Sequence, residues 1–131
     1  MKLTLDTNVL ARVLVDDDAA MQQCAAARAA LARAKVVFVP QVVQVELCWV
    51  LERAFALRHA EICTVLRALQ ATAKIELEQR AMFDATLDSF ARDAAWGFAD
   101  CLIATGAAHH QSTVLTFDKR LARLSGATLV H

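Results

Sequence analysis

The stretch Val36-Val37-Phe38-Val39-Pro40 decides the fold class of this chain. Its β-branched and aromatic residues form an apolar run without polar alternation, and Pro40 ends the run. A run of this kind predicts a strand over residues 36–39 that is buried on both faces, as in parallel sheets covered by helices.

Outward from this strand, short apolar runs alternate with stretches of helical periodicity. We expect further strands at residues 3–5, 75–77, 113–117 and 128–130. We expect helices at residues 7–15, from about 19 to 34, and at 41–55, 59–71, 79–94, 98–109 and 118–124. This alternation predicts an α/β fold with a parallel sheet and right-handed crossovers.

Length and composition point to one folded domain that spans residues 1–131. The chain has 131 residues, of which 57% are hydrophobic and 21% charged, and such a composition argues against intrinsic disorder. The formal net charge is zero, which excludes a polybasic nucleic-acid binder but leaves room for a local basic patch.

The cysteines and the apolar runs predict a cytoplasmic protein. Cys24, Cys48, Cys63 and Cys101 form no C-x-x-C pair, so a structural zinc site is not expected. The N-terminus shows no signal-peptide pattern, and no apolar run approaches the roughly 20 residues that span a bilayer. We therefore expect reduced thiols and no membrane association.

Two acidic residues directly follow predicted strands. Asp6 ends the first strand and opens the first helix, and Asp118 follows the strand at 113–117. In α/β folds, functional sites form beyond the carboxyl ends of strands, so both side chains are candidate site residues. The alternative is that each carboxylate only caps a helix N-terminus.

Two further acids share helical faces with apolar residues, where an unpaired carboxylate would be costly. Glu46 lies at helical spacing from a stripe of apolar residues: Val39, Val42, Val43, Trp49 and Val50. Asp100 shares its face with Ile103, Ala104 and Ala107. We expect both acids to face the core, with a metal or a charged partner. For Glu46 the alternative is an ion pair with an arginine such as Arg12 or Arg53, and for Asp100 it is a cap-like role in the first turn of its helix.

Asp6, Glu46, Asp100 and Asp118 together predict a metal site. Carboxylates crowded in one cleft repel, so they bind protons or hold a cation. An all-oxygen ligand set favours Mg²⁺ or Mn²⁺, which usually act on phosphate oxygens. The leading chemistry is therefore metal-dependent hydrolysis of a phosphodiester bond.

These residues resemble those of the PIN-domain family, and within it the VapC-type toxin ribonucleases. The matching segments follow the family order from Asp6 to Asp118: Leu5-Asp6-Thr7-Asn8, Val45-Glu46-Leu47, Ala99-Asp100-Cys101-Leu102-Ile103-Ala104 and Thr116-Phe117-Asp118-Lys119. The resemblance implies a three-layer α/β/α fold with a central parallel sheet of four to five strands. It also implies an endoribonuclease that depends on Mg²⁺ or Mn²⁺.

The resemblance also implies roles for individual residues. Asp6 and Asp100 would be the primary metal ligands, Glu46 would bind metal directly or through water, and Asp118 would complete the site. The residues that fit supporting roles around these carboxylates are Thr7, Asn8 and Thr116.

Partners follow from the same resemblance. VapC-type proteins are toxins with a cognate antitoxin, which blocks the acidic pocket and carries the DNA-binding domain, and homodimers are common. For the RNA substrate, the cluster Lys119, Arg120 and Arg123 is expected to contact phosphates, the alternative being a solvated helix face.

Three other functions fit the residues less well. An aspartyl phosphotransferase of the haloacid dehalogenase type usually has a second Asp two residues after the first, where this chain has Asn8. A phosphoacceptor receiver domain needs an acidic pair after its first strand, and Asp6 has no acidic neighbour. The alternative from another class is a catalytically silent interaction module with the PIN fold.

Overall fold

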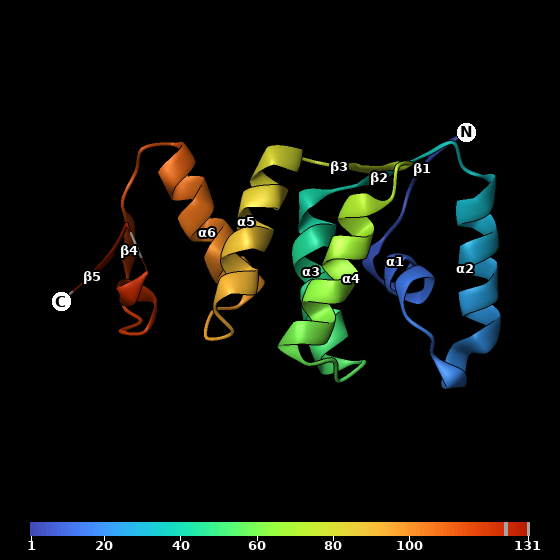
Figure 1. Cartoon of the computed structure of the whole chain (residues 1–131), viewed down its shortest axis with the longest axis horizontal. Coiled ribbons are helices and arrows are strands. Elements are labelled where there is room, and N and C mark those ends of the chain that lie inside the picture. Colours follow the sequence, from blue (N-terminus) through green and yellow to red (C-terminus); the bar gives the residue numbers. More distant parts are fainter. Residues whose placement is uncertain (125, 131) are drawn as a thin grey trace. The chain divides into compact units, whose positions relative to one another are not determined.

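The computed structural model describes residues 1–124 and 126–130, which form two compact units, Met1–Arg80 and Ala81–His131. Figure 1 labels the helices and strands along the chain. The expectation of a single domain over residues 1–131 stays a prediction.

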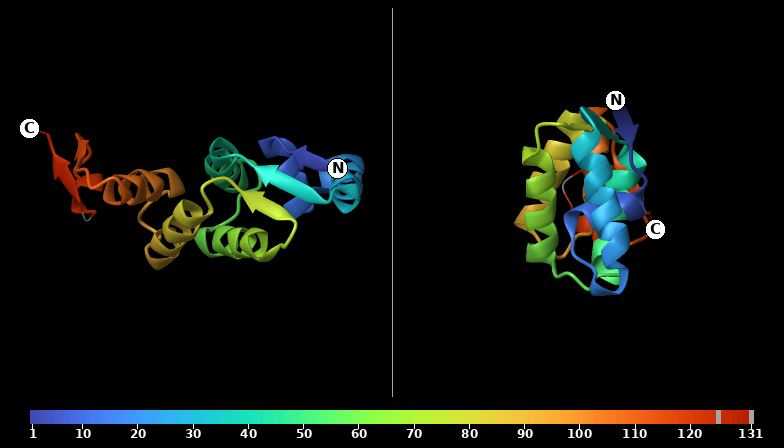
Figure 2. Two further views of the ribbon diagram at one scale, coloured as in Figure 1. Left: turned by 90° about the horizontal axis from the view of Figure 1, so that it is seen from above. Right: turned by 90° about the vertical axis from the view of Figure 1, so that its right-hand side faces the viewer.

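The first unit contains a three-stranded parallel sheet. Its strands are β1 (Lys2–Thr4), β2 (Val36–Val39) and β3 (Ile75–Leu77), in the order β1-β2-β3. Val37 of the central strand lies opposite Leu3 on one side and Ile75 on the other. Figure 2 shows β2 and β3 side by side, seen from above in its left panel. All three strands lie where the apolar runs predicted them, with β1 one residue earlier.

The two faces of this sheet differ. One face is closed, with the side chains of Val37, Val39, Ile75 and Leu77 all buried. On the other face Val36 and Phe38 are only half-buried. Their neighbours in register are charged: Lys2 Nζ lies 2.8 Å from Glu76 Oε2 and 5.8 Å from the centre of the Phe38 ring. The prediction that residues 36–39 are buried on both faces was therefore wrong, because polar neighbours keep the second face in contact with water.

Four α-helices complete the first unit: α1 (Thr7–Leu14), α2 (Met21–Arg33), α3 (Gln41–Arg53) and α4 (His59–Ala71). A short 3-10 helix, η1 (Asp18–Ala20), precedes α2. Helix α1 contacts both α2 and α3, and α3 contacts α4. Fully buried leucines from three of these helices form the core: Leu10, Leu47, Leu51, Leu66 and Leu69. Their burial drives the packing of this unit.

The second unit holds most of α5 (Arg80–Arg92), α6 (Phe98–His109) and two strands, β4 (Val114–Thr116) and β5 (Ala127–Leu129), which pair in parallel. Aromatic rings connect its two helices, with ring centres 6.0 Å apart for Phe83–Phe98 and 5.7 Å apart for Phe90–Phe98. The helix expected at residues 118–124 is only a short 3-10 helix, η2 (Leu121–Arg123).

The α/β class and the parallel strands predicted from the sequence are confirmed, with three strands in one sheet and two in the other. In the described part of the chain, no helix is both long and apolar enough to cross a membrane. The four cysteines are free thiols.

Candidate acidic site

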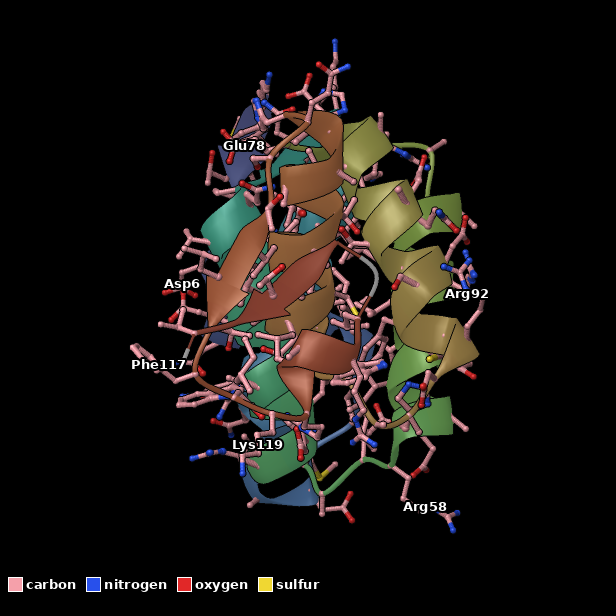
Figure 3. All side chains as sticks on the ribbon, turned by 90° about the vertical axis from the view of Figure 1, so that its left-hand side faces the viewer. Asp6, Arg58, Glu78, Arg92, Phe117 and Lys119 are labelled. Atoms are coloured by element: carbon pink, nitrogen blue, oxygen red, sulfur yellow. The ribbon has the colours of Figure 1, made fainter. Side chains whose placement is uncertain are left out.

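Asp6 sits where β1 ends and caps the N-terminus of α1. Its Oδ1 accepts a hydrogen bond of 3.0 Å from the backbone N–H of Val9, as the capping alternative predicts. The side chain is exposed, and Figure 3 shows Asp6 at the surface of the molecule. Among the described residues nothing bonds its Oδ2. Capping therefore uses one carboxylate oxygen and leaves the other available to a ligand.

Glu46 lies on α3 and meets the first turn of α1. The Thr7 hydroxyl donates a hydrogen bond of 3.2 Å to Glu46 Oε1, and Thr7 itself is only 8% exposed. Because Thr7 directly follows Asp6, this bond brings the Glu46 carboxylate to the end of α1 that Asp6 caps. Thr7 thus contacts one of the four acids, as the sequence predicted, while its role in catalysis stays a prediction.

The ion-pair alternative for Glu46 is wrong. Arg12 Nη2 instead lies 4.0 Å from Asp17 Oδ2. The Arg53 guanidinium stacks over the Trp49 ring at 4.1 Å from its centre. Within residues 1–124 and 126–130, neither Asp6 nor Glu46 forms an ion pair with a cationic side chain.

The expectation that Glu46 faces the core was also wrong. In the first unit Glu46 is exposed, and so are two residues of its stripe, Val42 (63% accessible) and Trp49 (60%), whereas Val39 and Val43 of the same stripe are buried. The buried face of α3 overlaps the expected stripe only at Val43 and is formed by Val43, Gln44, Leu47, Cys48 and Leu51. Helix α3 carries apolar residues on both faces, so periodicity alone does not identify the buried one. The buried Gln44 amide donates to the carbonyl oxygens of Val39 and Glu78, which satisfies its polar group.

Asp100 lies in the first turn of α6, which begins after Gly97. Its side chain is 28% exposed, and Ile103 on the same face is 52% exposed. The buried residues of α6 are Phe98 and Cys101. Asp100 therefore lies at the edge of the core and not inside it as expected, but the charged partner that the sequence analysis expected is present in Arg120.

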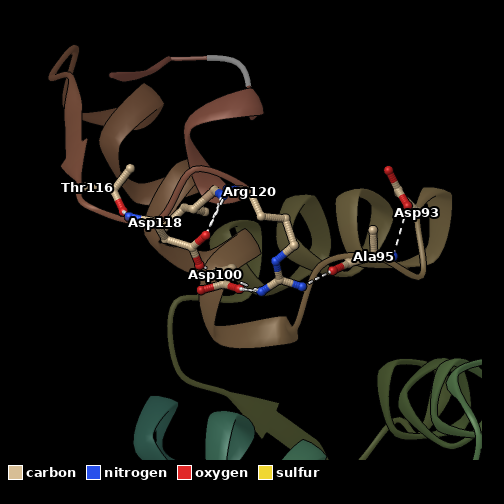
Figure 4. A network of polar contacts seen from close by, with 7 residues as sticks. Asp93, Ala95, Asp100, Thr116, Asp118 and Arg120 are labelled. Atoms are coloured by element: carbon tan, nitrogen blue, oxygen red, sulfur yellow. Dashed lines mark hydrogen bonds and ion pairs between the residues drawn. The ribbon is translucent and has the colours of Figure 1, made fainter. Parts of the chain in front are cut away.

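Arg120 pairs with both acids of the second unit. Its Nη2 lies 3.5 Å from Asp100 Oδ2 and 4.0 Å from Asp118 Oδ2, as Figure 4 shows. Its Nη1 donates to the carbonyl oxygen of Ala95, and its guanidinium lies 5.4 Å from the centre of the Trp96 ring. The sequence predicted Arg120 only as an RNA contact; the pairing with two acids carried no sequence signal beyond proximity to Asp118.

The Asp118 carboxylate closes the turn that leads into η2, whose N-cap is Arg120. Its Oδ1 accepts hydrogen bonds from the backbone N–H groups of Arg120, at 2.8 Å, and of Leu121, at 3.3 Å. The Thr116 hydroxyl oxygen accepts from the backbone N–H of Asp118 at 3.0 Å. Thr116 therefore fixes the backbone that carries Asp118, which fits the supporting position expected for it.

The remaining predicted residues are exposed and have unpaired side chains in the described part of the chain: Asn8, Lys119 and Arg123. Figure 3 shows Lys119 extending from the surface. The cationic groups of Lys119 and Arg123 are thus accessible, as contacts to RNA would require. The Asn8 amide bonds no carboxylate among the described residues, so its supporting role stays a prediction.

The thiol of Cys101, which follows Asp100 in the sequence, is shielded from solvent. Burial raises the pKa of the Cys101 thiol, and the negative charge of Asp100 raises it further. Cys101 is fully buried, so it packs as a small apolar side chain, as the sequence suggested.

No group of three or more His, Cys, Asp or Glu side chains within the described residues is arranged to hold a metal ion. Each unit contributes a pair of acids, Asp6 with Glu46 and Asp100 with Asp118. Mg²⁺ is usually held by one or two carboxylates together with water, so the oxygen donors of either pair fit such an ion. The chemistry of the donors agrees with a hard divalent cation.

A comparison with family models finds the PIN domain over residues 3–127, nearly the whole chain. A search of the curated proteins found no match to this sequence. PIN domains are in general metal-dependent nucleases, which agrees with the oxygen-rich acidic residues at the ends of β1 and β4. The chain therefore belongs to the PIN-domain family.

Proposed function

We propose that this protein is an endoribonuclease that depends on Mg²⁺ or Mn²⁺ and hydrolyses phosphodiester bonds of RNA. The proposed catalytic residues are Asp6, Glu46, Asp100 and Asp118. The observation that carries the proposal is the meeting of Asp6 and Glu46 around Thr7 without a neutralising cation. Uncompensated carboxylates of this kind attract a divalent ion.

In the first unit, Asp6 would bind the metal ion and Glu46 would orient the attacking water. Asp6 caps α1 through Oδ1, so Oδ2 is the oxygen that would hold the metal. Thr7 holds Oε1 of Glu46, which leaves Oε2 to orient the attacking water and accept its proton. The divalent ion, when bound, would stabilise negative charge on the phosphate oxygens.

The residues of the second unit would add charge and phosphate binding. Asp100 is the second proposed primary ligand, and Asp118 completes the acidic set. Arg120 balances both carboxylates in the metal-free chain. The exposed cations Lys119 and Arg123 would hold the RNA backbone, where phosphate contacts position the strand without reading its sequence.

We further propose that the protein is the toxin of a toxin–antitoxin pair and forms a homodimer. Support comes from the resemblance of its acidic segments to those of VapC-type toxins. The zero formal net charge fits a chain that reaches DNA only through its antitoxin.

The test is cleavage of total cellular RNA by the purified protein with Mg²⁺, with Mn²⁺ and with chelator. We expect discrete fragments that disappear with chelator and with Asp6→Asn. Asp18→Asn is the matched control, because Asp18 is also an exposed acid but opens η1 away from the site. Metal-dependent fragments that persist at the wild-type level in Asp6→Asn would show that cleavage does not depend on the proposed acidic site and would contradict the proposal.

The second candidate function is a catalytically silent interaction module. The pairing of Arg120 with Asp100 and Asp118 favours it, because a guanidinium there already neutralises two of the proposed ligands. Mn²⁺ binding without cleavage of any RNA in the same experiment would support this alternative.

A further inference from the structure

A cavity of about 630 Å³ lies between α1 and α2 and adjoins the proposed catalytic acid Asp6. Its volume lies within the range of small-ligand pockets. Its walls come entirely from the first unit: Asp6, Asn8, Val9, Arg12, Gln23, Ala26, Ala27 and Ala30. The cavity thus combines one acid, one cation, two amides and a small apolar wall.

The cation in this cavity is held only by weak contacts. Arg12 Nη1 donates to the carbonyl oxygen of Asn8 at 3.5 Å, and Nη2 lies 4.0 Å from Asp17 Oδ2. Its Nε is shielded from solvent and has no hydrogen-bond partner among the described residues. Both distances are at the outer limit for such interactions, and a shielded donor without a partner is uncommon in folded proteins. An anion in the cavity would give this guanidinium closer partners.

The other walls suit a planar polar ring. The side-chain amides of Asn8 and Gln23 are exposed and bond to no described residue, so both offer a donor and an acceptor. The α2 wall is formed by small alanine side chains, which allow a flat ring to approach closely. Single-stranded RNA is recognised through hydrogen bonds to base edges and contacts with base faces.

We propose that this cavity binds one ribonucleotide of the RNA, adjacent to the phosphate that is cleaved. Arg12 contacts the phosphate of this nucleotide, the amides of Asn8 and Gln23 bind the base edge, and the alanines of α2 contact its face. The inference rests on the proposed nuclease function for its substrate, and the position of Asp6 in the cavity wall connects the two. Arg12 is here a binding residue, and Asn8 and Gln23 determine base preference.

The test is a titration of the full chain with AMP, GMP, CMP or UMP in the presence of chelator. Calorimetry measures the Kd of each nucleotide. We expect at least one nucleotide to bind the wild type. Its affinity should fall at least tenfold in Arg12→Gln, which removes the cation, and in Ala26→Leu, whose larger side chain fills the cavity. The matched controls on α2 are Arg33→Gln and Ala29→Leu, both exposed and outside the cavity. These controls should bind within twofold of the wild type, and thermal melting should show that all variants fold.

Several outcomes would overturn the inference. One is that no nucleotide binds at millimolar concentration. Another is that the control variants lose as much nucleotide affinity as Arg12→Gln and Ala26→Leu. A third is that inorganic phosphate binds as tightly as the nucleotides. Tighter binding of an acidic peptide, lost in Arg12→Gln, would assign the cavity to a protein ligand instead.

Cleavage of a short RNA separates this inference from the proposed function. Nucleotide binding in chelator needs no catalysis, so binding that depends on Arg12 without any metal-dependent cleavage would refute only the nuclease. Cleavage that depends on Asp6, with nucleotide binding unchanged in Arg12→Gln, would refute only the cavity. If both hold, Arg12→Gln should raise KM about tenfold and change kcat less than threefold.

Discussion

Carboxylates of the two units are held by different kinds of partner. In the first unit, Asp6 accepts from a backbone N–H and Glu46 from the Thr7 hydroxyl, both neutral donors. In the second unit, Asp100 and Asp118 share the guanidinium of Arg120, although Asp118 Oδ1 also accepts from two backbone N–H groups. Neutral donors orient a carboxylate without cancelling its charge, whereas a guanidinium competes with any incoming cation. We therefore expect the first pair to attract a metal ion more strongly than the second.

The largest expected effect is a loss of RNA cleavage when one carboxylate charge is removed, either from the pair Asp6 and Glu46 or from the pair Asp100 and Asp118. Asp100→Asn and Asp6→Asn should each lower cleavage by about 10³-fold, because a metal ligand is lost and developing charge goes unstabilised. Both variants should stay folded, since the side chain keeps its shape. Cleavage rates on a defined RNA measure the loss of activity, and circular dichroism checks that the variants are folded. Cleavage by Asp100→Asn near the wild-type rate would show that Asp100 is not part of the site.

Metal binding should stabilise the protein through the first pair. At Mg²⁺ or Mn²⁺ concentrations one hundred times Kd, linkage predicts a gain of about 2.7 kcal/mol in the free energy of unfolding. The melting temperature should therefore rise with metal in the wild type and rise less in Glu46→Gln. An unchanged melting temperature at millimolar metal would count against a metal site in this protein.

Thr7→Val should lower the free energy of unfolding by about 1 kcal/mol, because it removes the hydrogen bond from Thr7 to Glu46 at a buried position. Urea denaturation measures this loss. Thr113→Val is a control at an exposed threonine. Equal stability of Thr7→Val and the wild type would show that the hydroxyl does not hold Glu46.

The smallest expected effect is a change in Mn²⁺ affinity when Arg120 is replaced. Because the pair partners are substantially exposed, its attraction to Asp100 and Asp118 is worth about 0.2–1 kcal/mol. Arg120→Gln should therefore tighten Mn²⁺ binding by about two- to fivefold, measured by calorimetry, while Arg123→Gln leaves it unchanged. Unchanged or weaker binding in Arg120→Gln would show that the guanidinium does not compete with the metal.

Features set by neighbouring residues in sequence were predicted well. The strand at 36–39 and the helix at 59–71 have the expected bounds, because short-range apolar patterns and turn residues determine them. The cap at Asp6 was predicted as the alternative to a site role, and the structure confirms it while leaving one oxygen free. Local chemistry therefore predicted both what Asp6 does in the fold and why it remains a candidate ligand.

Features set by distant residues were predicted poorly. Glu46 was expected in the core, yet it is exposed, because α3 has apolar residues on two faces and packing selected the other. The exposed side of β2 depends on Lys2 and Glu76, which are far from it in sequence. The cavity beside Asp6 needed α2 to pack against α1, and no motif marks Arg12 or Gln23 as its walls.

The sequence by itself determined the α/β class, the positions of the strands and the acids that mark a PIN domain. These depend on backbone preferences and side-chain types within a few residues of each other. Only the tertiary structure decided which helix faces are buried and which carboxylates share Arg120. The physical reason is that burial and ion pairing depend on which surfaces meet, and several pairings satisfy the same apolar pattern.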